Sequence, residues 1–311
     1  MPRRTSRPRP PLPRPPDGLN TLTGSDDSGA YRSGLELSFD EPIAPPPASA
    51  GVLRSARRLL RRKDRLAIGE FLAEGRQAVS EALGADGVVR RVLVSETAVD
   101  AHQDLLNIAA RAGLPAATVS AKASGELSDT VTPQGILAIC RVVDVPLDQA
   151  LVAGARLVVL CDQIRDPGNL GTVIRCADAF GADGVLVSKE SVDLYNPKTV
   201  RASTGSLFHL PISVGVDLAE AAAQARAAGL AVLGADGAAH CTVDDLVTTG
   251  ELAAPTLWVL GNEAWGLPAE HAELLDRLVA LPIHGRAESL NLSTAAAVLL
   301  YASATAQRAA R

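Results

Sequence analysis

The second half of the chain alternates short apolar runs with helical segments, and this alternation restricts the fold more than any other feature of the sequence. The apolar runs are too short for helices and are rich in Val, Leu and Ala. Strands that alternate with helices usually pair in parallel and are covered by helices on both faces. We therefore expect an α/β domain with a mainly parallel sheet over residues 155–311. The runs that predict its strands are ARLVVLCDQ, DGVLVS, LAVLGAD, TLWVLGNE and RLVALPI.

A smaller α/β domain is expected over residues 51–145. VVRRVLVSE, PAATVS and QGILAICRVV are typical of strands, and HQDLLNIAARAG is typical of a helix. The segment DVPLDQALVAG then links the two domains. Residues 1–50 are rich in Pro, Arg, Ser and Gly with little apolar periodicity, which predicts a disordered tail.

An arginine-rich segment opens the smaller domain, where residues 52–83 predict one or two helices. Its arginines recur at three- and four-residue spacing, which would place them on one helical face. Such a face either contacts a polyanion such as RNA or is simply solvated, and the spacing alone leaves both open. The arginines are Arg54, Arg57, Arg58, Arg61, Arg62 and Arg65.

Composition excludes several classes of protein. The sequence contains no run of about 18 uncharged apolar residues, so no membrane span is expected. The proline-rich N-terminus lacks the apolar core of a secretory signal. The 4 cysteines lie far apart without CxxC pairs, which favours reduced thiols and a cytoplasmic location. The histidines lack the spacing of metal ligands, so no metal is expected. The net charge of −5 by itself argues against a nucleic-acid binder, but the distribution of the charge says more than the total.

Three polar motifs follow predicted strands, and in open parallel sheets ligands bind beyond the carboxyl ends of strands. In DPGNLGTVIRCAD, Asn169 is either a helix cap or a functional amide, and Arg175 either pairs with Asp178 or acts in a site. In LGNEAWGLP, Gly261 permits close approach to the backbone, and Glu263 is a working carboxylate or a loop charge. In SLNLS, the serines could serve only as caps of the alanine-rich helix that begins near Ser293.

Two nucleotide-binding classes are disfavoured by the glycines. Neither GADG segment supplies the GxGxxG pattern between a strand and a helix, which argues against a dinucleotide enzyme. The absence of GxxxxGK[ST] excludes a P-loop NTPase.

Taken together, the three motifs resemble those of the SpoU (TrmH-like) branch of the SPOUT RNA methyltransferases. The matching patterns are N-x-G-x-x-x-R, G-N-E-x-x-G and S-L-N-L-S, the last with Leu where relatives often have Val. The segments YNPKTVRASTGSLFHLP, LSDTVTPQGILAICR and EFLAEGRQAVSEAL extend the resemblance over residues 52–308. Only the proline- and arginine-rich tail lies outside it.

The resemblance implies a homodimer that transfers the methyl group of S-adenosyl-L-methionine to a ribose 2′-hydroxyl in rRNA or tRNA. It implies a trefoil-knotted SPOUT domain and an N-terminal L30e-like domain that binds the RNA. By analogy the catalytic residues are Asn169, Arg175, Glu263, Ser289 and Asn291. The implied cofactor-binding residues are Gly261, Leu281, Ile283, Leu290, Leu292 and Arg201, the last reaching toward cofactor or RNA phosphate.

Arginine stays protonated at a pKa above about 12. We therefore favour Arg175 as an electrostatic clamp on phosphate and the developing alkoxide rather than as a base. Two other functions fit the same motifs: an RNA-binding protein of this fold without catalysis, and a methyltransferase that confers antibiotic resistance by acting on the ribosome.

Overall fold

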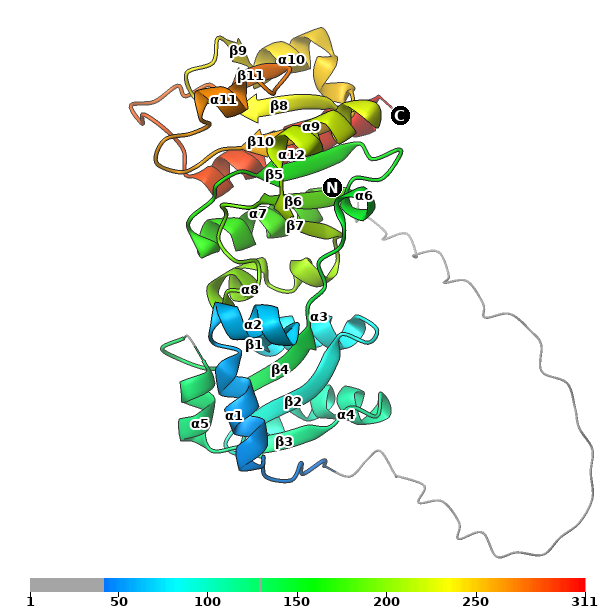
Figure 1. Ribbon diagram of the computed structural model, residues 1–311, viewed down its shortest axis with the longest axis vertical. Coiled ribbons are helices and arrows are strands. Elements are labelled where there is room, and N and C mark those ends of the chain that lie inside the picture. Colours follow the sequence, from blue (N-terminus) through cyan, green and yellow to red (C-terminus); the bar gives the residue numbers. More distant parts are fainter. Residues whose placement is uncertain (1–41, 129, 311) are drawn as a thin grey trace, which may run out of the picture. The chain divides into compact units, whose positions relative to one another are not determined.

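The computed structural model describes residues 42–128 and 130–310, and this part of the chain forms two β-sheets (Figure 1). The N-terminal sheet has the order β1-β4-β2-β3, in which β4 is antiparallel to both neighbours and β2 pairs in parallel with β3. Its strands are β1 Glu70–Glu74, β2 Val89–Ser95, β3 Ala116–Val119 and β4 Ile136–Arg141. Its helices are α1 Ala50–Arg58, α2 Arg62–Ile68, α3 Arg76–Gly84, α4 Gln103–Arg111 and α5 Ala121–Leu127.

The C-terminal sheet is parallel throughout, with the order β7-β6-β5-β10-β8-β11-β9. It confirms the predicted α/β class with a mainly parallel sheet. Its strands are β5 Leu157–Cys161, β6 Gly184–Ser188, β7 Ile212–Val216, β8 Ala231–Ala235, β9 Cys241–Thr242, β10 Thr256–Leu260 and β11 Arg277–Ala280. Its helices are α6 Leu147–Ala150, α7 Pro167–Phe180, α8 Pro197–Ser203, α9 Leu218–Ala227, α10 Val243–Thr249, α11 Ala269–Ala272 and α12 Leu292–Ala309.

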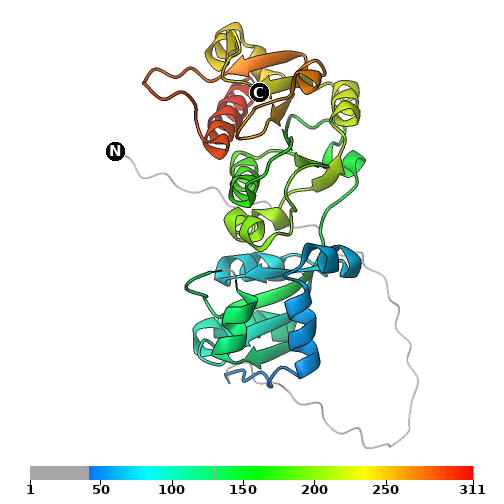
Figure 2. The same ribbon diagram turned by 60° about the vertical axis from the view of Figure 1, so that its left-hand side comes forward.

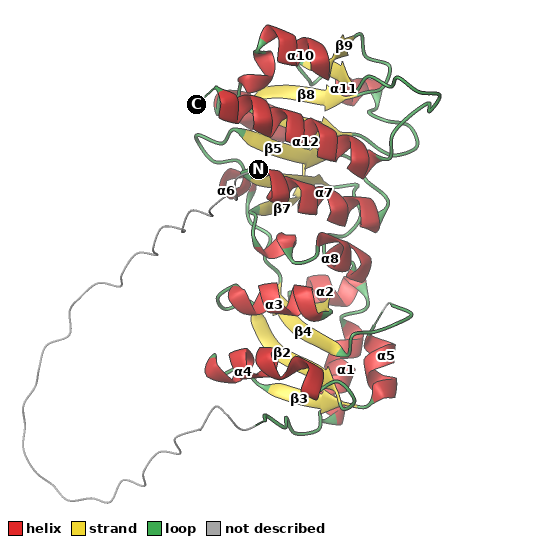
Figure 3. Cartoon of the chain, turned by 180° about the vertical axis from the view of Figure 1, so that it is seen from behind, coloured by secondary structure: helices red, strands yellow, loops and turns green. Residues whose placement is uncertain are grey.

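The central strands of this sheet are buried on both faces, which explains their continuous apolar runs. On β5, Val159 packs into a core that includes α7 and α12, whereas its neighbours Val158 and Leu160 pack against α9 on the opposite face. Helices α7 and α12 lie together over one face (Figure 3). None of the described helices is both long enough and apolar enough to cross a membrane.

The smaller sheet is also covered on both faces. Helix α1, drawn in blue in Figure 2, packs through Ala56 and Leu59 against the face that carries Leu93 and Leu137. The other face packs against α3 and α4.

The prediction of a disordered tail over residues 1–50 is wrong for residues 42–49, which run alongside β3 and form hydrogen bonds with it. Residues 1–41 lie outside the described residues. Ala48 N donates to Thr118 O over 2.8 Å, Thr118 N donates to Pro46 O over 2.9 Å, and Ile43 is tied to Gln103. The change in composition at Gly51 therefore coincides with the first helix, whereas contacts with the domain begin before it, within residues 42–49.

The prediction of helix over residues 52–83 was wrong for residues 70–74, which form β1. Gly69 and Gly75 flank this strand with φ of 72° and 91°, values that favour glycine and end the helical path on each side. The sequence reading also missed β7 and the two-residue strand β9.

One buried ion pair joins α2 to the loop after β6. Arg65 Nη2 lies 2.5 Å from Asp193 Oδ2, and the exposed fractions of the two side chains are 5% and 11%. Arg65 Nη1 also donates to Leu59 O over 2.8 Å. A charge buried to this degree is tolerated only while it is paired and hydrogen-bonded.

Replacing Arg65 by alanine is therefore expected to lower the free energy of unfolding by roughly 3–5 kcal/mol, because Asp193 would remain buried without its cation. Urea unfolding of the variant measures the change. The matched control is Arg90→Ala, which breaks a half-exposed pair with Glu70 at 3.5 Å and should cost less than about 1 kcal/mol. Equal losses in the two variants would contradict the prediction.

Candidate active site

The first turn of α7 carries the first motif. Asp166, not Asn169, caps this helix: its side chain accepts a hydrogen bond from Asn169 N over 2.9 Å. Lys198 donates to the other carboxylate oxygen of Asp166 over 2.8 Å, and this bond lowers the pKa of that carboxyl. The expectation of Asn169 as a cap was thus wrong, and its amide group is available for other contacts.

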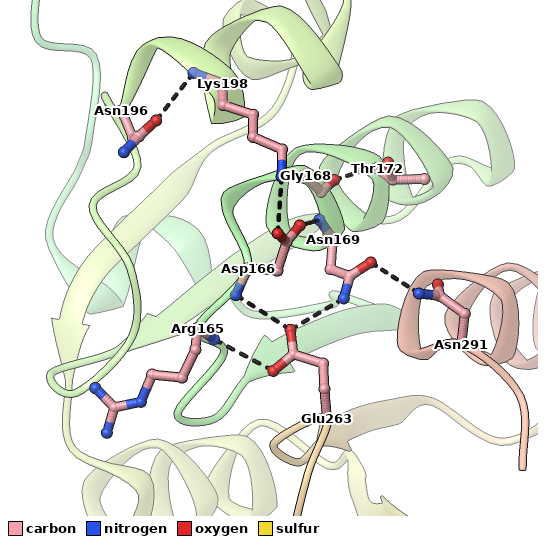
Figure 4. Close-up of polar contacts among 9 residues, drawn as sticks. All are labelled: Arg165, Asp166, Gly168, Asn169, Thr172, Asn196, Lys198, Glu263 and Asn291. Carbon is pink, nitrogen blue, oxygen red and sulfur yellow. Dashed lines mark hydrogen bonds and ion pairs between the residues drawn. The ribbon is translucent and has the colours of Figure 1, made fainter.

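Glu263 joins the second motif to the first (Figure 4). Its Oε2 accepts from Arg165 N, and its Oε1 accepts from Asp166 N, each over 3.3 Å. Oε1 also accepts from Asn169 Nδ2 over 3.1 Å. The carboxylate therefore holds the turn before α7, so it is more than an isolated loop charge.

Asn291 joins the third motif to this group. Its Nδ2 donates to Asn169 Oδ1 over 3.1 Å, as Figure 4 shows. Its own Oδ1 accepts from Ser293 N over 2.9 Å, so Asn291, rather than Ser289 or Ser293, caps α12. Glu263, Asn169 and Asn291 thus form one hydrogen-bonded polar chain from three distant motifs.

A cavity of about 440 Å³ opens beside this polar chain at the carboxyl ends of β8, β10 and β11. Its volume is in the range of small-molecule sites. Leu260, Val279 and Leu299 add apolar surface to its wall. Most of the site residues expected from the sequence line it, namely Asn169, Gly261, Glu263, Leu281, Ile283, Ser289, Leu290, Asn291 and Leu292.

The wall at Gly261 is backbone packed against backbone. A Cβ at this position would lie 2.5 Å from Gly266 C and 2.7 Å from Leu267 N. Asn262 and Gly266 close the turn by donating to each other's carbonyl oxygens over 2.9 Å. Only glycine fits here without displacing the backbone that it packs against.

Arg175 and Arg201 are not among the residues that line the cavity. Arg175 lies six residues after Asn169, about 9 Å further along α7 and on a different face of that helix, and its side chain is exposed. Arg201 instead approaches Glu74, with Nη1 3.4 Å from Oε2. Arg201 as a residue that reaches cofactor or RNA phosphate stays a prediction, and in this chain its side chain lies outside the cavity.

The predicted single face of six arginines is also corrected. The helical path breaks between α1 and α2, and Arg61 precedes α2 in extended conformation. Arg65 is buried against Asp193 and cannot reach RNA from there. Four of the others line one surface hollow: Arg54, Arg57, Arg58 and Arg61.

Comparison with known proteins agrees with this geometry. The SpoU rRNA Methylase family model matches residues 156–301, and the MRM3-like substrate binding domain model matches residues 52–138. The 23S rRNA (guanosine(2553)-2'-O)-methyltransferase RlmP of Bacillus subtilis is 35% identical, over 79% of this chain and 92% of the relative. The chain belongs to the SpoU rRNA methylase family. The resemblance seen in the motifs is thereby confirmed.

Other SpoU-family proteins support the same assignment. The 23S rRNA (uridine(2479)-2'-O)-methyltransferase of Streptomyces viridochromogenes is 35% identical, over 77% of this chain and 84% of the relative. The crystal structure of the SpoU methyltransferase AviRb from the same species, in complex with the cofactor AdoMet, superimposes with a TM-score of 0.72. That match has 32% identity and covers 85% of this chain and 100% of the other.

The sequence analysis of this SpoU-family chain did not predict Asp236 and Glu288 at the cavity, and it included Asn262 in the second motif without assigning it a role. Asp236 directly follows β8, so the rule that ligands bind beyond strand ends would have found it. Asn262 is 5% exposed and donates to Gln163 O over 2.7 Å. Nothing in the sequence pattern distinguishes Glu288 from an ordinary loop charge.

Proposed function

We propose that this chain transfers the methyl group of S-adenosyl-L-methionine to a ribose 2′-oxygen of RNA, with 23S rRNA as the substrate. The observation that carries the proposal is the convergence of Asn169, Glu263 and Asn291 at the rim of one apolar-walled cavity. Family membership and relatives named as 23S rRNA 2′-O-methyltransferases support it.

The residues of the cavity fit this cofactor, which supplies an electrophilic methyl group when it is bound. At Gly261 the missing side chain lets the backbone of Gly266 and Leu267 pack against it, which shapes this wall of the cavity. Apolar side chains suit an adenosine body, and the carboxylates of Asp236 and Glu288 suit the cofactor's cationic groups. The apolar residues proposed to hold the adenosine are Leu281, Ile283, Leu290 and Leu292.

The polar chain would orient the ribose hydroxyl beside the cavity. The Asn169 amide is fixed at both ends, by Glu263 and by Asn291, so it has one defined orientation. Such preorganised dipoles contribute to catalysis because they need no rearrangement during reaction. Ser289 lines the same cavity and would add a hydroxyl group to this set.

Arg175 is proposed to act as the electrostatic clamp on the RNA phosphate and the developing alkoxide. Because it lies outside the cavity of its own subunit, we propose a homodimer in which Arg175 completes the partner's site. Exposed apolar side chains on α12, Val298 at 43% and Tyr301 at 59%, support this helix as part of the dimer surface. We also propose that the C-terminal domain contains a trefoil knot and that the protein acts in the cytoplasm. The proposed domains span residues 51–145 and 155–311.

Methyl transfer can be tested with purified protein, 23S rRNA transcript and cofactor labelled in the methyl group. The expected result is label at a single ribose, mapped by resistance of the adjacent bond to alkaline cleavage. RNA binding without methyl transfer would instead support the catalytically silent alternative, which the intact set of polar residues disfavours. The methylated nucleotide, together with drug sensitivity of cells with and without the gene, would separate a resistance enzyme from a housekeeping one.

Four arginines line the hollow beside α1, and they are proposed to bind RNA phosphates together with Arg62, which follows Arg61 in sequence. Arg65 is left out of this set because it is buried against Asp193. Glu126 lies 2.6 Å from Arg57 and Asp64 lies 3.2 Å from Arg58, so these two anions partly offset the charge. Within the described residues, Arg54, Arg61 and Arg62 form no ion pair.

Changing Arg54, Arg57, Arg58 and Arg61 together to glutamine is expected to weaken RNA binding and to flatten its salt dependence. Each lost phosphate contact should reduce the slope of log K against log salt by about 0.7–0.9. Filter binding at several salt concentrations measures both effects, and cofactor affinity should not change. Arg226→Gln with Arg277→Gln is the control for lost charge elsewhere, and an equal change of slope in this control would refute the assignment.

A further inference from the structure

His209 bridges two carboxylates from different helices. It follows the short 3-10 helix η2 (Ser206–Phe208), and its Nδ1 lies 2.8 Å from Asp178 Oδ2 on α7. Its Nε2 lies 3.1 Å from Glu81 Oε2 on α3. An imidazole donates from both nitrogens only when it is protonated, so the complete bridge requires a positively charged His209.

The surroundings of His209 favour this charged form. Burial lowers the pKa of His209, but the hydrogen bonds and charges of Asp178 and Glu81 outweigh burial and raise the pKa above its ordinary value. The helices packed against η2 are α3, α7 and α8. Their other charged side chains, apart from Arg175, have acidic partners of their own: Arg76 with Asp104, Lys198 with Asp166 and Arg201 with Glu74.

Arg175 is the exception on these helices. It is exposed, and no described residue forms a hydrogen bond or an ion pair with it. Asp178 follows it by three positions on α7, a spacing at which side chains of opposite charge meet. The sequence alone would therefore allow an Arg175–Asp178 pair, but in the structure the Asp178 carboxylate faces His209.

We propose that His209 is a positioning residue that holds Asp178 away from Arg175 and thereby keeps the Arg175 guanidinium open for RNA phosphate. An internal anion three residues away competes with phosphate for the same guanidinium. Binding that anion elsewhere removes the competition without any contact between His209 and RNA. The inference rests on the role of Arg175 in the proposed function and adds a second residue that controls it.

The competition sets the size of the expected effect. Ion pairs between exposed side chains change an equilibrium by up to about fivefold. His209→Ala should therefore reduce methyl transfer about two- to fivefold at low RNA concentration, through KM for RNA more than through kcat. Adding Asp178→Asn to this variant removes the competing anion and should restore the lost activity.

A matched variant separates positioning from a merely structural link between helices. Glu81→Gln breaks the other half of the bridge but leaves Asp178 bound to His209. It should therefore have a smaller effect on KM than His209→Ala, although both variants loosen the same junction. Thermal unfolding of all variants shows whether the fold is retained.

The pH profile provides a further readout. Below about 6.5, the ordinary pKa of histidine, the bridge is complete, and it is lost as pH rises through the raised pKa of folded His209. The wild type should show this step in KM for RNA, whereas the His209→Ala, Asp178→Asn double variant should not.

Three outcomes decide the matter. Restored activity in the double variant, with a smaller effect of Glu81→Gln, supports the inference. If the double variant has no more methyl transfer activity than His209→Ala, the inference is overturned. The proposed function still stands in that case if Arg175→Ala is inactive. If Arg175→Ala retains full methyl transfer, the assigned role of Arg175 fails and the inference fails with it.

Discussion

Replacing Arg175 by alanine is expected to lower kcat for RNA methylation on the order of 100- to 1,000-fold, the usual loss when one preorganised donor to a developing oxyanion is removed. Cofactor affinity should remain close to that of the wild type, because Arg175 does not line the cavity. Single-turnover methyl transfer and calorimetric titration with S-adenosyl-L-methionine measure the two quantities separately.

The lysine variant sharpens this test. Lysine keeps the positive charge but lacks the planar fork that binds two oxygens of a phosphate. The kcat of Arg175→Lys should therefore lie between those of the wild type and the alanine variant. If the alanine variant lost cofactor affinity in proportion to its rate, Arg175 would be a binding residue of the cavity and the proposed clamp would be wrong.

Replacing Gly261 by alanine is expected to weaken cofactor binding by roughly 5- to 150-fold. The added Cβ would lie 2.5 Å from Gly266 C, so one side of the turn must move and the cavity wall with it. Overpacking of this kind costs roughly 1–3 kcal/mol, which corresponds to that range of affinity. Calorimetric titration with the cofactor gives the value directly.

Gly285→Ala is the matched control for this substitution. Gly285 lies in the loop that follows β11, and a Cβ added there meets no atom within 4 Å. The control should bind the cofactor as the wild type does. Equal weakening in the two variants would mean that loop flexibility, rather than the packed wall at Gly261, determines affinity.

The sequence predicted the parallel sheet well because its central strands are buried on both faces and read as uninterrupted apolar runs. Edge and connecting elements were harder to predict. Residues 70–74 offer only three consecutive buried residues between two glutamates, a run too short to distinguish a strand from the helices on each side, and β1 is defined by its pairing with β4. The same holds for residues 42–49, whose order depends on hydrogen bonds to Thr118, distant in sequence.

At the candidate site, the sequence predicted which residues lie there but not which hydrogen bonds they form. The motifs identified the residues at the cavity, because these lie at strand ends and the resemblance assigned them roles. Their hydrogen-bond roles depended on geometry instead: Asp166 took the capping position expected of Asn169, and Asn291 took the one expected of the serines. The arginine spacing predicted a face that required one continuous helix, and the break after α1 divided it.

The polar chain of Glu263, Asn169 and Asn291 also has a consequence for synthesis of the protein. Asn169 is separated by 94 residues from Glu263 and by 122 from Asn291, so no early fragment of the chain contains the complete group. Contacts between such distant segments form late in folding, because a long loop must close first. A nascent or truncated chain would therefore lack the complete polar group, and only a finished molecule would gain catalytic competence.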